Sequence, residues 1–129
     1  MTLSLGEATA LFGRRRDAWL AEDVEAYLDC WVDDLVLEVP GRRIVGRDAY
    51  EDMVRRSFAW ARPLRFEFHH LAVAGDVVHA YWSIAVERRA DAAEVEWRGM
   101  SVAELRDGRI VWWREFYEDP AALARARNP

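Results

Sequence analysis

The sequence predicts an α+β fold in which helices cover one face of a curved antiparallel sheet. Apolar residues recur at helical spacing in the first half of the chain, whereas apolar and polar residues alternate with period two in the second half. Turn sequences divide this second half into four strands. A length of 129 residues, 52% of them hydrophobic, suits a single domain over residues 1–129 that buries roughly two-thirds of the surface of its unfolded chain.

Three helices are predicted in the N-terminal part. The first runs from Ser4 to Leu20, and a Ser-x-x-Glu pattern at its start predicts a capping box. A short second helix follows from about Val24 to Trp31, with Asp23 as its N-terminal cap. The third helix runs from Arg47 to Ala61 and ends where a proline follows.

Strands account for most of the remaining chain. Leu35 to Val39 is short and rich in β-branched residues, and a Pro-Gly pair stops it, so we expect a strand before the third helix. The turn sequences Gly75-Asp76 and Asp107-Gly108 separate strands of an antiparallel meander. The four meander strands are predicted at Leu64 to Val73, Val77 to Glu87, Glu94 to Arg106 and Arg109 to Tyr117, and a last helical turn at Pro120 to Arg127.

Composition excludes several classes of function. All eighteen basic residues are Arg, and without Lys the chain has neither a Schiff-base lysine nor the lysine of a phosphate-binding loop. The net charge of −5 argues against nucleic acid as a partner. The single cysteine, Cys30, has no cysteine partner, and no metal-ligand spacing occurs, so we expect no metal and no cofactor. No apolar run suits a membrane helix or signal peptide, so we expect a cytoplasmic protein.

Three short motifs carry a family resemblance. They are Val32-Asp33-Asp34-Leu35, Gly46-Arg47-Asp48, and the segment from Asp107 to Glu115 that contains Asp-Gly-Arg-Ile-Val and Trp-Arg-Glu. Together they resemble the NTF2-like superfamily in its SnoaL-like branch, whose relatives include ketosteroid isomerases, limonene epoxide hydrolases, scytalone dehydratases and polyketide cyclases. The resemblance implies a cone, in which the sheet wraps around a cavity that the N-terminal helices close. It does not imply one reaction, because the chemistry differs among members.

The resemblance also orients the strands. In the epoxide hydrolases the acidic residue after Trp-Arg in the last strand points into the cavity, and that position is Glu115 here. Period-two alternation then sorts the other strand residues onto the two faces. The predicted inward set is Leu37, Val39, Phe66, Phe68, His70, Val78, Trp82, Ile84, Trp97, Gly99, Ser101, Ala103, Val111, Trp113, Glu115 and Tyr117.

The catalytic residues of the named relatives are largely missing. The Arg-x-Asp pair of the epoxide hydrolases falls on Trp82 and Ile84, so we expect no hydrolysis of limonene-type epoxides. The aspartate base of the ketosteroid isomerases falls on Val39, and their oxyanion donors fall near Arg15 and at Ser101. The His69-His70 pair is not in the context of a scytalone dehydratase site. Neither an epoxide hydrolase nor a ketosteroid isomerase is predicted.

Three residues are candidates for catalysis. An apolar wall disfavours the charged form of a carboxylate, and this suits Glu115 as a proton carrier. The alternative interpretations of Glu115 are an ion pair with a helix Arg or a solvated position at the mouth of the cone. His70 is a candidate proton shuttle, or an imidazole bonded to the backbone. Tyr117 is a candidate oxyanion donor, or a packing residue with a solvated hydroxyl. The predicted substrate wall comprises Val39, Phe66, Phe68, Ile84, Trp82, Trp97 and Trp113, with Ser101 as a polar contact.

The arginine clusters have simpler interpretations. Arg14, Arg15 and Arg16 are interpreted as a solvated helix face. The pairs Arg42-Arg43 and Arg88-Arg89 are expected in turns, where one of them at the cavity mouth would attract an anionic substrate.

Three functions remain open. The first is a cofactor-free isomerase, cyclase or dehydratase that acts on a small apolar molecule, cyclic or polyketide-like, and uses Glu115. The second is a protein that binds a hydrophobic ligand without catalysis, and the third is an interaction module whose cone its own Trp side chains fill. A second polar group aimed at the same point as Glu115 would favour the enzyme. The apolar outer face of the meander predicts a homodimer; this face carries Tyr81, Ser83, Arg98, Met100, Val102, Trp112, Arg114 and Phe116.

Overall fold

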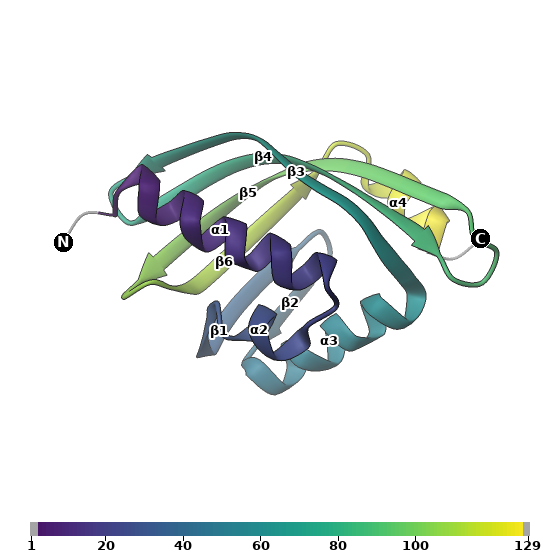
Figure 1. Cartoon of the computed structure of the whole chain (residues 1–129), viewed down its shortest axis with the longest axis horizontal. Helices are drawn as coiled ribbons and strands as arrows, with labels where there is room; N and C mark the ends of the chain where they lie inside the picture. Colours follow the sequence, from purple (N-terminus) through teal and green to yellow (C-terminus); the bar gives the residue numbers. More distant parts are fainter. Residues whose placement is uncertain (1–2, 128–129) are drawn as a thin grey trace.

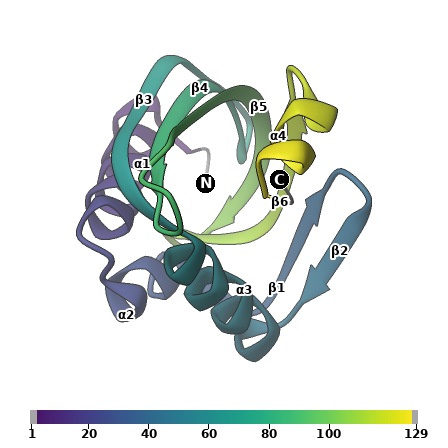
Figure 2. The ribbon, with the colours of Figure 1, turned by 90° about the vertical axis from the view of Figure 1, so that its right-hand side faces the viewer.

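A curved, unclosed sheet of six strands in the order β2-β1-β6-β5-β4-β3 forms the frame of the molecule. The computed structural model describes residues 3–127. Figure 2 shows the strands in an open arc with α1, α2 and α3 across its open side. The elements, shown in Figure 1, are α1 (Leu5–Leu20), α2 (Val24–Leu28), β1 (Trp31–Val39), β2 (Arg42–Val45), α3 (Arg47–Trp60), β3 (Ala61–Ala74), β4 (Val77–Arg88), β5 (Glu94–Arg106), β6 (Arg109–Tyr117) and α4 (Pro120–Arg127).

The predicted helix starts are confirmed. The Ser4 side chain accepts a hydrogen bond from the Glu7 amide at 3.0 Å, while the Glu7 carboxylate accepts from the Ser4 amide at 3.1 Å. This is the predicted capping box, and Asp23 caps α2 in the same way by accepting from the amide of Ala26. The end of α2 is a correction, because the helix stops at Leu28 and Trp31 begins β1, where it pairs with Ile110 of β6.

The antiparallel meander is confirmed, with β5 and β6 at the predicted bounds. β3 starts earlier than predicted and contains Pro63, which a strand tolerates here because β3 is an edge of the sheet. β2 was not predicted: Arg42 and Arg43 belong to this short strand and not to a turn.

A parallel pairing between β1 and β6 completes the sheet and sets Leu37 beside Trp113. The two strands lie far apart in the sequence, and β2, α3 and β3 to β5 form the connection between them. This pairing brings the first predicted strand to the strand that carries Glu115.

Bulges change the predicted alternation at two of the assigned positions. In β3 the register shifts between Phe68 and His70, so that His70 pairs with Tyr81 and shares its outward direction. In β6 the register shifts before Trp112, and Ile110 rather than Val111 joins the core cluster. One extra residue in a strand exchanges the faces of the side chains on one side of the bulge relative to those on the other. The local sequence gives no signal of such a residue.

The largest side chains of the core, between the helices and the sheet, are aromatic. Trp31, Trp82, Trp113 and Phe12 are its largest fully buried side chains. Gly99 is required beside them, because a Cβ at that position would lie 2.9 Å from the Trp82 ring and closer still to the backbone oxygen of Phe116.

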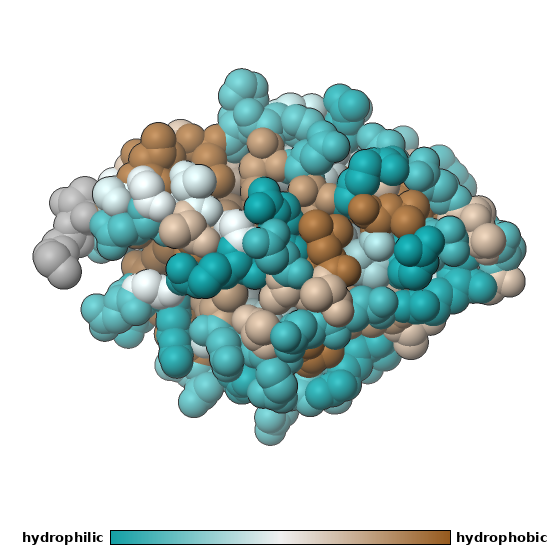
Figure 3. Space-filling model, viewed as in Figure 1, coloured by the Kyte–Doolittle hydropathy of each residue, from teal (hydrophilic) through white to brown (hydrophobic). Residues whose placement is uncertain are grey.

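Hydrophilic side chains predominate on the face of the molecule that Figure 3 shows, with smaller apolar patches between them. Within residues 3–127, no helix combines the length and apolar character that crossing a membrane requires.

Candidate functional site

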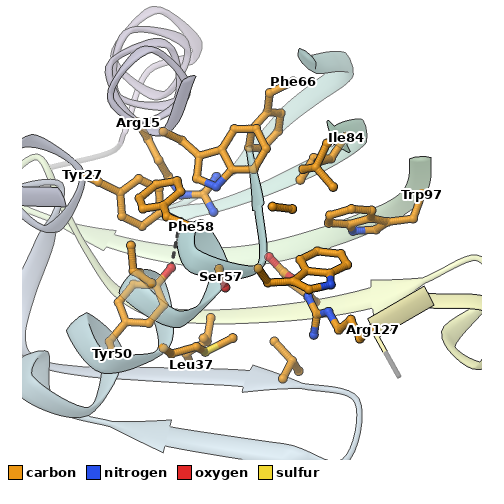
Figure 4. A pocket seen from close by; sticks show the side chains of 18 of the residues that line it. Arg15, Tyr27, Leu37, Tyr50, Ser57, Phe58, Phe66, Ile84, Trp97 and Arg127 are labelled. Atoms are coloured by element: carbon orange, nitrogen blue, oxygen red, sulfur yellow. Dashed lines mark hydrogen bonds between the residues drawn. The ribbon is translucent and has the colours of Figure 1, made fainter. Parts of the chain in front are cut away.

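A cavity lies inside the cone, between the sheet and helices α1 to α3, and the end of α4 reaches it (Figure 4). About 90 Å³ of it is open to the centres of water molecules. Because roughly 10–15 Å³ on this measure holds one water, the cavity has room for a small organic ligand. The third interpretation considered above, an interaction module whose cone is filled by its own Trp side chains, is therefore wrong.

The predicted substrate wall divides into two groups. Val39, Phe66, Ile84 and Trp97 line the cavity. The other four predicted residues lie behind this wall in the packed interior and are not cavity-lining: Phe68, Trp82, Ser101 and Trp113.

The Ser101 hydroxyl has a structural partner. It accepts a hydrogen bond of 2.8 Å from Nε1 of Trp82, and both residues are fully buried. The predicted contact of Ser101 with a substrate is not supported, because this hydroxyl is buried, is bonded to Trp82 and does not line the cavity.

His70 does not face the cavity. Its ring is exposed and stacks on Tyr81 with the planes 13° apart, on the outer face of the sheet. The predicted inward position of His70 is wrong, and the bulge in β3 is the reason. Its neighbour His69 is also on the outer face, where its Nε2 lies 2.8 Å from the hydroxyl of Ser83.

Glu115 lines the cavity and is held there by two donors on its own strand. Trp113 Nε1 donates to Oε1 and the Tyr117 hydroxyl donates to Oε2, each at 2.9 Å. Burial, followed by the Glu115 charge, raises the pKa of Tyr117 far above its usual range, so this hydroxyl keeps its proton. Within residues 3–127 no salt bridge to Glu115 occurs, so the predicted alternative of an ion-paired glutamate is not observed.

Arg15 is the residue that the sequence analysis missed. Its side chain is 4% exposed, not solvated, and it lines the cavity. The guanidinium carbon lies 4.1 Å from the ring centre of Trp113, and three further rings surround it at 5.2 to 6.0 Å. Such contacts stabilise a cation without hydrogen bonds. Nε and Nη1 are both buried and have no hydrogen-bond partner among the described residues.

Two tyrosines stand beside Arg15. The hydroxyls of Tyr27 and Tyr50 lie 2.8 Å apart and both residues line the cavity; Figure 4 shows this pair on the same side of the cavity as Arg15, with Trp97 and Arg127 on the other side. Burial raises the pKa of each tyrosine, so both hydroxyls remain protonated. Burial lowers the pKa of Arg15, but its electrostatic surroundings, which include the Glu115 charge, outweigh burial and the pKa is raised. Arg15 is therefore a cation among neutral hydroxyls.

The sequence did contain one signal for Arg15. It lies at helical spacing from Ala8, Leu11, Phe12 and Ala18, on the stripe that α1 buries. A charged residue in the middle of an apolar stripe is a candidate for function, because burying it is costly unless something compensates.

No metal-binding cluster of three or more His, Cys, Asp or Glu side chains occurs in residues 3–127. The groups that can act on a ligand in the cavity include the Glu115 carboxylate, the guanidinium groups of Arg15 and Arg127, and the hydroxyls of Tyr27, Tyr50, Ser57 and Tyr117. This set supplies one proton acceptor and several fixed donors within a largely aromatic enclosure.

The open cone and its buried cavity define an NTF2-like protein, the class to which similar solved structures are assigned. The model of the SnoaL-like domain matches residues 13–113, and the chain belongs to this family.

Solved structures share the fold over most of the chain. A provisionally assigned isomerase from Bacillus subtilis has 21% identity and a TM-score of 0.86, with 98% of this chain and 96% of that chain covered. An LEH-like epoxide hydrolase from M. tuberculosis has 25% identity and a TM-score of 0.76, with 88% and 84% covered. A provisionally assigned polyketide cyclase from Xanthomonas campestris pv. campestris has 19% identity and a TM-score of 0.76, with 95% and 96% covered.

Proposed function

We propose that the protein is an acid–base enzyme of the isomerase, cyclase or dehydratase type that uses no cofactor. Its substrate is an apolar molecule, cyclic or polyketide-like, that lies against the aromatic wall of the cavity. One observation carries the proposal: a carboxylate, Glu115, and a buried cation, Arg15, line the same cavity without a salt bridge between them, and Nε and Nη1 of Arg15 have no hydrogen-bond partner among the described residues.

The proposed reaction is a proton transfer. Glu115 removes a proton from a carbon next to a substrate carbonyl; the electron pair of the broken C–H bond forms a C=C bond, and the π pair of the carbonyl moves onto its oxygen. Arg15 and the Tyr27–Tyr50 pair stabilise this oxyanion by charge and hydrogen bonding. Glu115 then returns the proton to a different carbon for an isomerisation, or to a leaving oxygen for a dehydration.

The donors on Glu115 fit this role. A carboxylate has about four lone-pair sites, and Trp113 and Tyr117 occupy two of them. The remaining sites can accept a proton, while the two hydrogen bonds fix the direction of the carboxylate. Tyr117, a predicted oxyanion donor, acts in this scheme as a positioning residue for Glu115.

The test is hydrogen exchange in a cyclic ketone. Exchange of the α-protons of 2-tetralone in D₂O is followed by NMR with the wild type, Glu115→Gln and the exposed control Glu118→Gln. We expect the wild type and the control to accelerate exchange over buffer, and Glu115→Gln to lose roughly 10²- to 10⁴-fold of this acceleration. A wild type that binds 2-tetralone and other cyclic ketones without accelerating exchange contradicts the proposal and favours a binding protein.

Limonene oxide serves as a second probe. We expect no diol above the buffer background, because Trp82 and Ile84 offer no group that could orient and activate a water molecule. Mass spectrometry of small molecules that copurify with the protein would identify the natural ligand directly.

We also propose a homodimer through the outer face of the meander. Met100 and Phe116 pair across β5 and β6 on this face, and each is 49% exposed. Exposed apolar residues gathered on one face commonly mark an interface.

A further inference from the structure

The charged side chains that line the cavity do not balance. Two cations, Arg15 and Arg127, and one carboxylate, Glu115, leave a net charge of +1 on the lining. The whole chain carries a net charge of −5, so this cationic enclosure is opposite in sign to the protein around it.

Arg15 is the less compensated of the two cations. Arg127 lies at the other side of the cavity over the ring of Trp60, 5.4 Å from its centre, in the last helix of the chain. Arg15 is enclosed by rings, and its buried Nε and Nη1 donate to no atom of residues 3–127. A buried donor that is left unpaired is costly, and in a native protein it commonly points to a missing acceptor.

The tyrosine pair adds an unused donor next to Arg15. Each hydroxyl has one proton, so in the hydrogen bond between Tyr27 and Tyr50 one hydroxyl donates and the proton of the other has no acceptor among the described residues. The Arg15 guanidinium and the Tyr27–Tyr50 hydroxyls therefore lie on the same side of the cavity, where one ligand acceptor can meet both.

We propose that Arg15 and the Tyr27–Tyr50 pair form a binding site for the carboxylate of an organic acid whose apolar body lies against Phe66 and Trp97. This names a ligand class of the cavity, and it rests on the proposed function only in using the same cavity, where the carboxylate takes the place that the proposed reaction gives to the oxyanion. A carboxylate fits better than a phosphate monoester, because one negative charge balances the lining whereas a phosphate monoester carries about −1.5 to −2 at neutral pH.

The experiment compares an acid with its neutral amide. Binding of 4-(trifluoromethyl)benzoate and 4-(trifluoromethyl)benzamide is measured by ¹⁹F NMR at pH 7 with the wild type, Arg15→Met and Arg14→Met. Arg14 is exposed on the same helix and serves as the matched control. We expect the wild type and the control to prefer the benzoate by roughly 10-fold to 100-fold, and Arg15→Met to lose this preference.

Several outcomes overturn the proposal. Equal affinity of the wild type for acid and amide does so without any variant, and so does tighter binding of 4-(trifluoromethyl)phenyl phosphate than of the benzoate. If Arg15→Met does not fold, Tyr27→Phe replaces it and is expected to weaken the preference several-fold; an unchanged preference in Tyr27→Phe then contradicts the site.

Glu115→Gln separates this proposal from the proposed function. Removing the carboxylate of Glu115 takes away a like charge, so benzoate binding to Glu115→Gln should equal or exceed that of the wild type. This result is expected whether or not the wild type accelerates proton exchange. Loss of benzoate binding in Glu115→Gln contradicts the carboxylate site, whereas a failure of the exchange assay contradicts only the acid–base function.

Discussion

The guanidinium of Arg15 lies 4.1 Å from the centre of the Trp113 ring, and Trp113 in turn donates a hydrogen bond to Glu115. One indole therefore contacts the buried cation through its face and the carboxylate through its edge. This relationship links the two charged groups of the cavity although they do not form an ion pair.

Replacing Arg15 by Met should leave the free energy of unfolding unchanged or raise it by up to about 2 kcal/mol. An apolar side chain removes the cost of a buried charge, while the lost ring contacts offset part of the gain. Urea unfolding at pH 7 measures the effect, and Arg14→Met should stay within about 0.5 kcal/mol of the wild type. A loss above about 2 kcal/mol would mean that the rings hold Arg15 mainly for stability.

Glu115→Gln should change stability by about 1 kcal/mol or less, because its oxygen can still accept from Trp113 and no salt bridge among residues 3–127 is broken. Thermal unfolding from pH 5 to 8 is the measurement. A structural ion pair in the interior would instead cost about 3–5 kcal/mol when broken, and a loss of that size at pH 7 would remove Glu115 from the catalytic scheme.

Ser101→Ala should lower the free energy of unfolding by about 1–3 kcal/mol, because it leaves Nε1 of Trp82 buried without an acceptor. Ser57, which lines the cavity, provides the comparison: Ser57→Ala should have little effect on stability. Chemical unfolding of both variants tests the assignment. Weaker ligand binding by a fully stable Ser101→Ala variant would mean that the Ser101 hydroxyl does contact the ligand.

Asp91 should make stability depend on pH in acid. Arg88 donates to both Asp91 oxygens, at 2.9 and 2.6 Å, and together with the Ala93 amide lowers the pKa of Asp91 from 3.8 to about 2. The pKa of Asp91 is lower in the folded than in the unfolded state. The contribution of its carboxylate to stability is therefore complete above pH 4 and is lost as the pH falls to about 2.

The measurement for Asp91 is the stability difference between the wild type and Asp91→Asn from pH 6 to 2. The wild type should be the more stable above pH 4, and the difference should close below it. The same Arg88 donates to the backbone oxygen of Ala126 in α4 at 2.8 Å, so the variant should also loosen that helix. A difference that does not vary with pH would contradict the pairing.

The proposed homodimer should give a dimer mass in sedimentation at micromolar concentration. Phe116→Asp places a charge beside Met100 on the outer face and should shift the protein toward the monomer. Leu5→Asp is the matched control, because Leu5 is also an exposed apolar residue but lies at the start of α1. A wild-type monomer at this concentration would contradict the proposal.

The meander could be predicted because both of its determinants are local. The period of two and the turn sequences at Gly75 and Gly108 are visible in a few residues, and both glycines have the positive φ that such turns require. β2 could not be found in this way, because two arginines in four residues read as a turn.

The site was less predictable because it depends on residues that are distant in the sequence. Glu115 was placed in the cavity by the family resemblance, and the period of two carried this placement to Tyr117, because no bulge separates these two residues in β6. Arg15 was assigned to solvent since the groups that bury it, among them Tyr27, Phe66 and Trp113, come from three other elements. His70 was assigned to the wrong face because a bulge leaves no mark in the composition of the strand.

An unclosed sheet leaves two strands with unpaired backbone groups, and here these strands are β2 and β3. Edges of this kind can recruit strands from other molecules and start aggregation. β2 has only four residues, two of them Arg, while β3 carries Pro63, Arg65, Glu67 and the bulge at His69, and packs against α1. Charge, proline and irregular register thus make both borders poor templates for β-addition, and the cone can stay open, with a cavity inside, at little risk of polymerising through its rims.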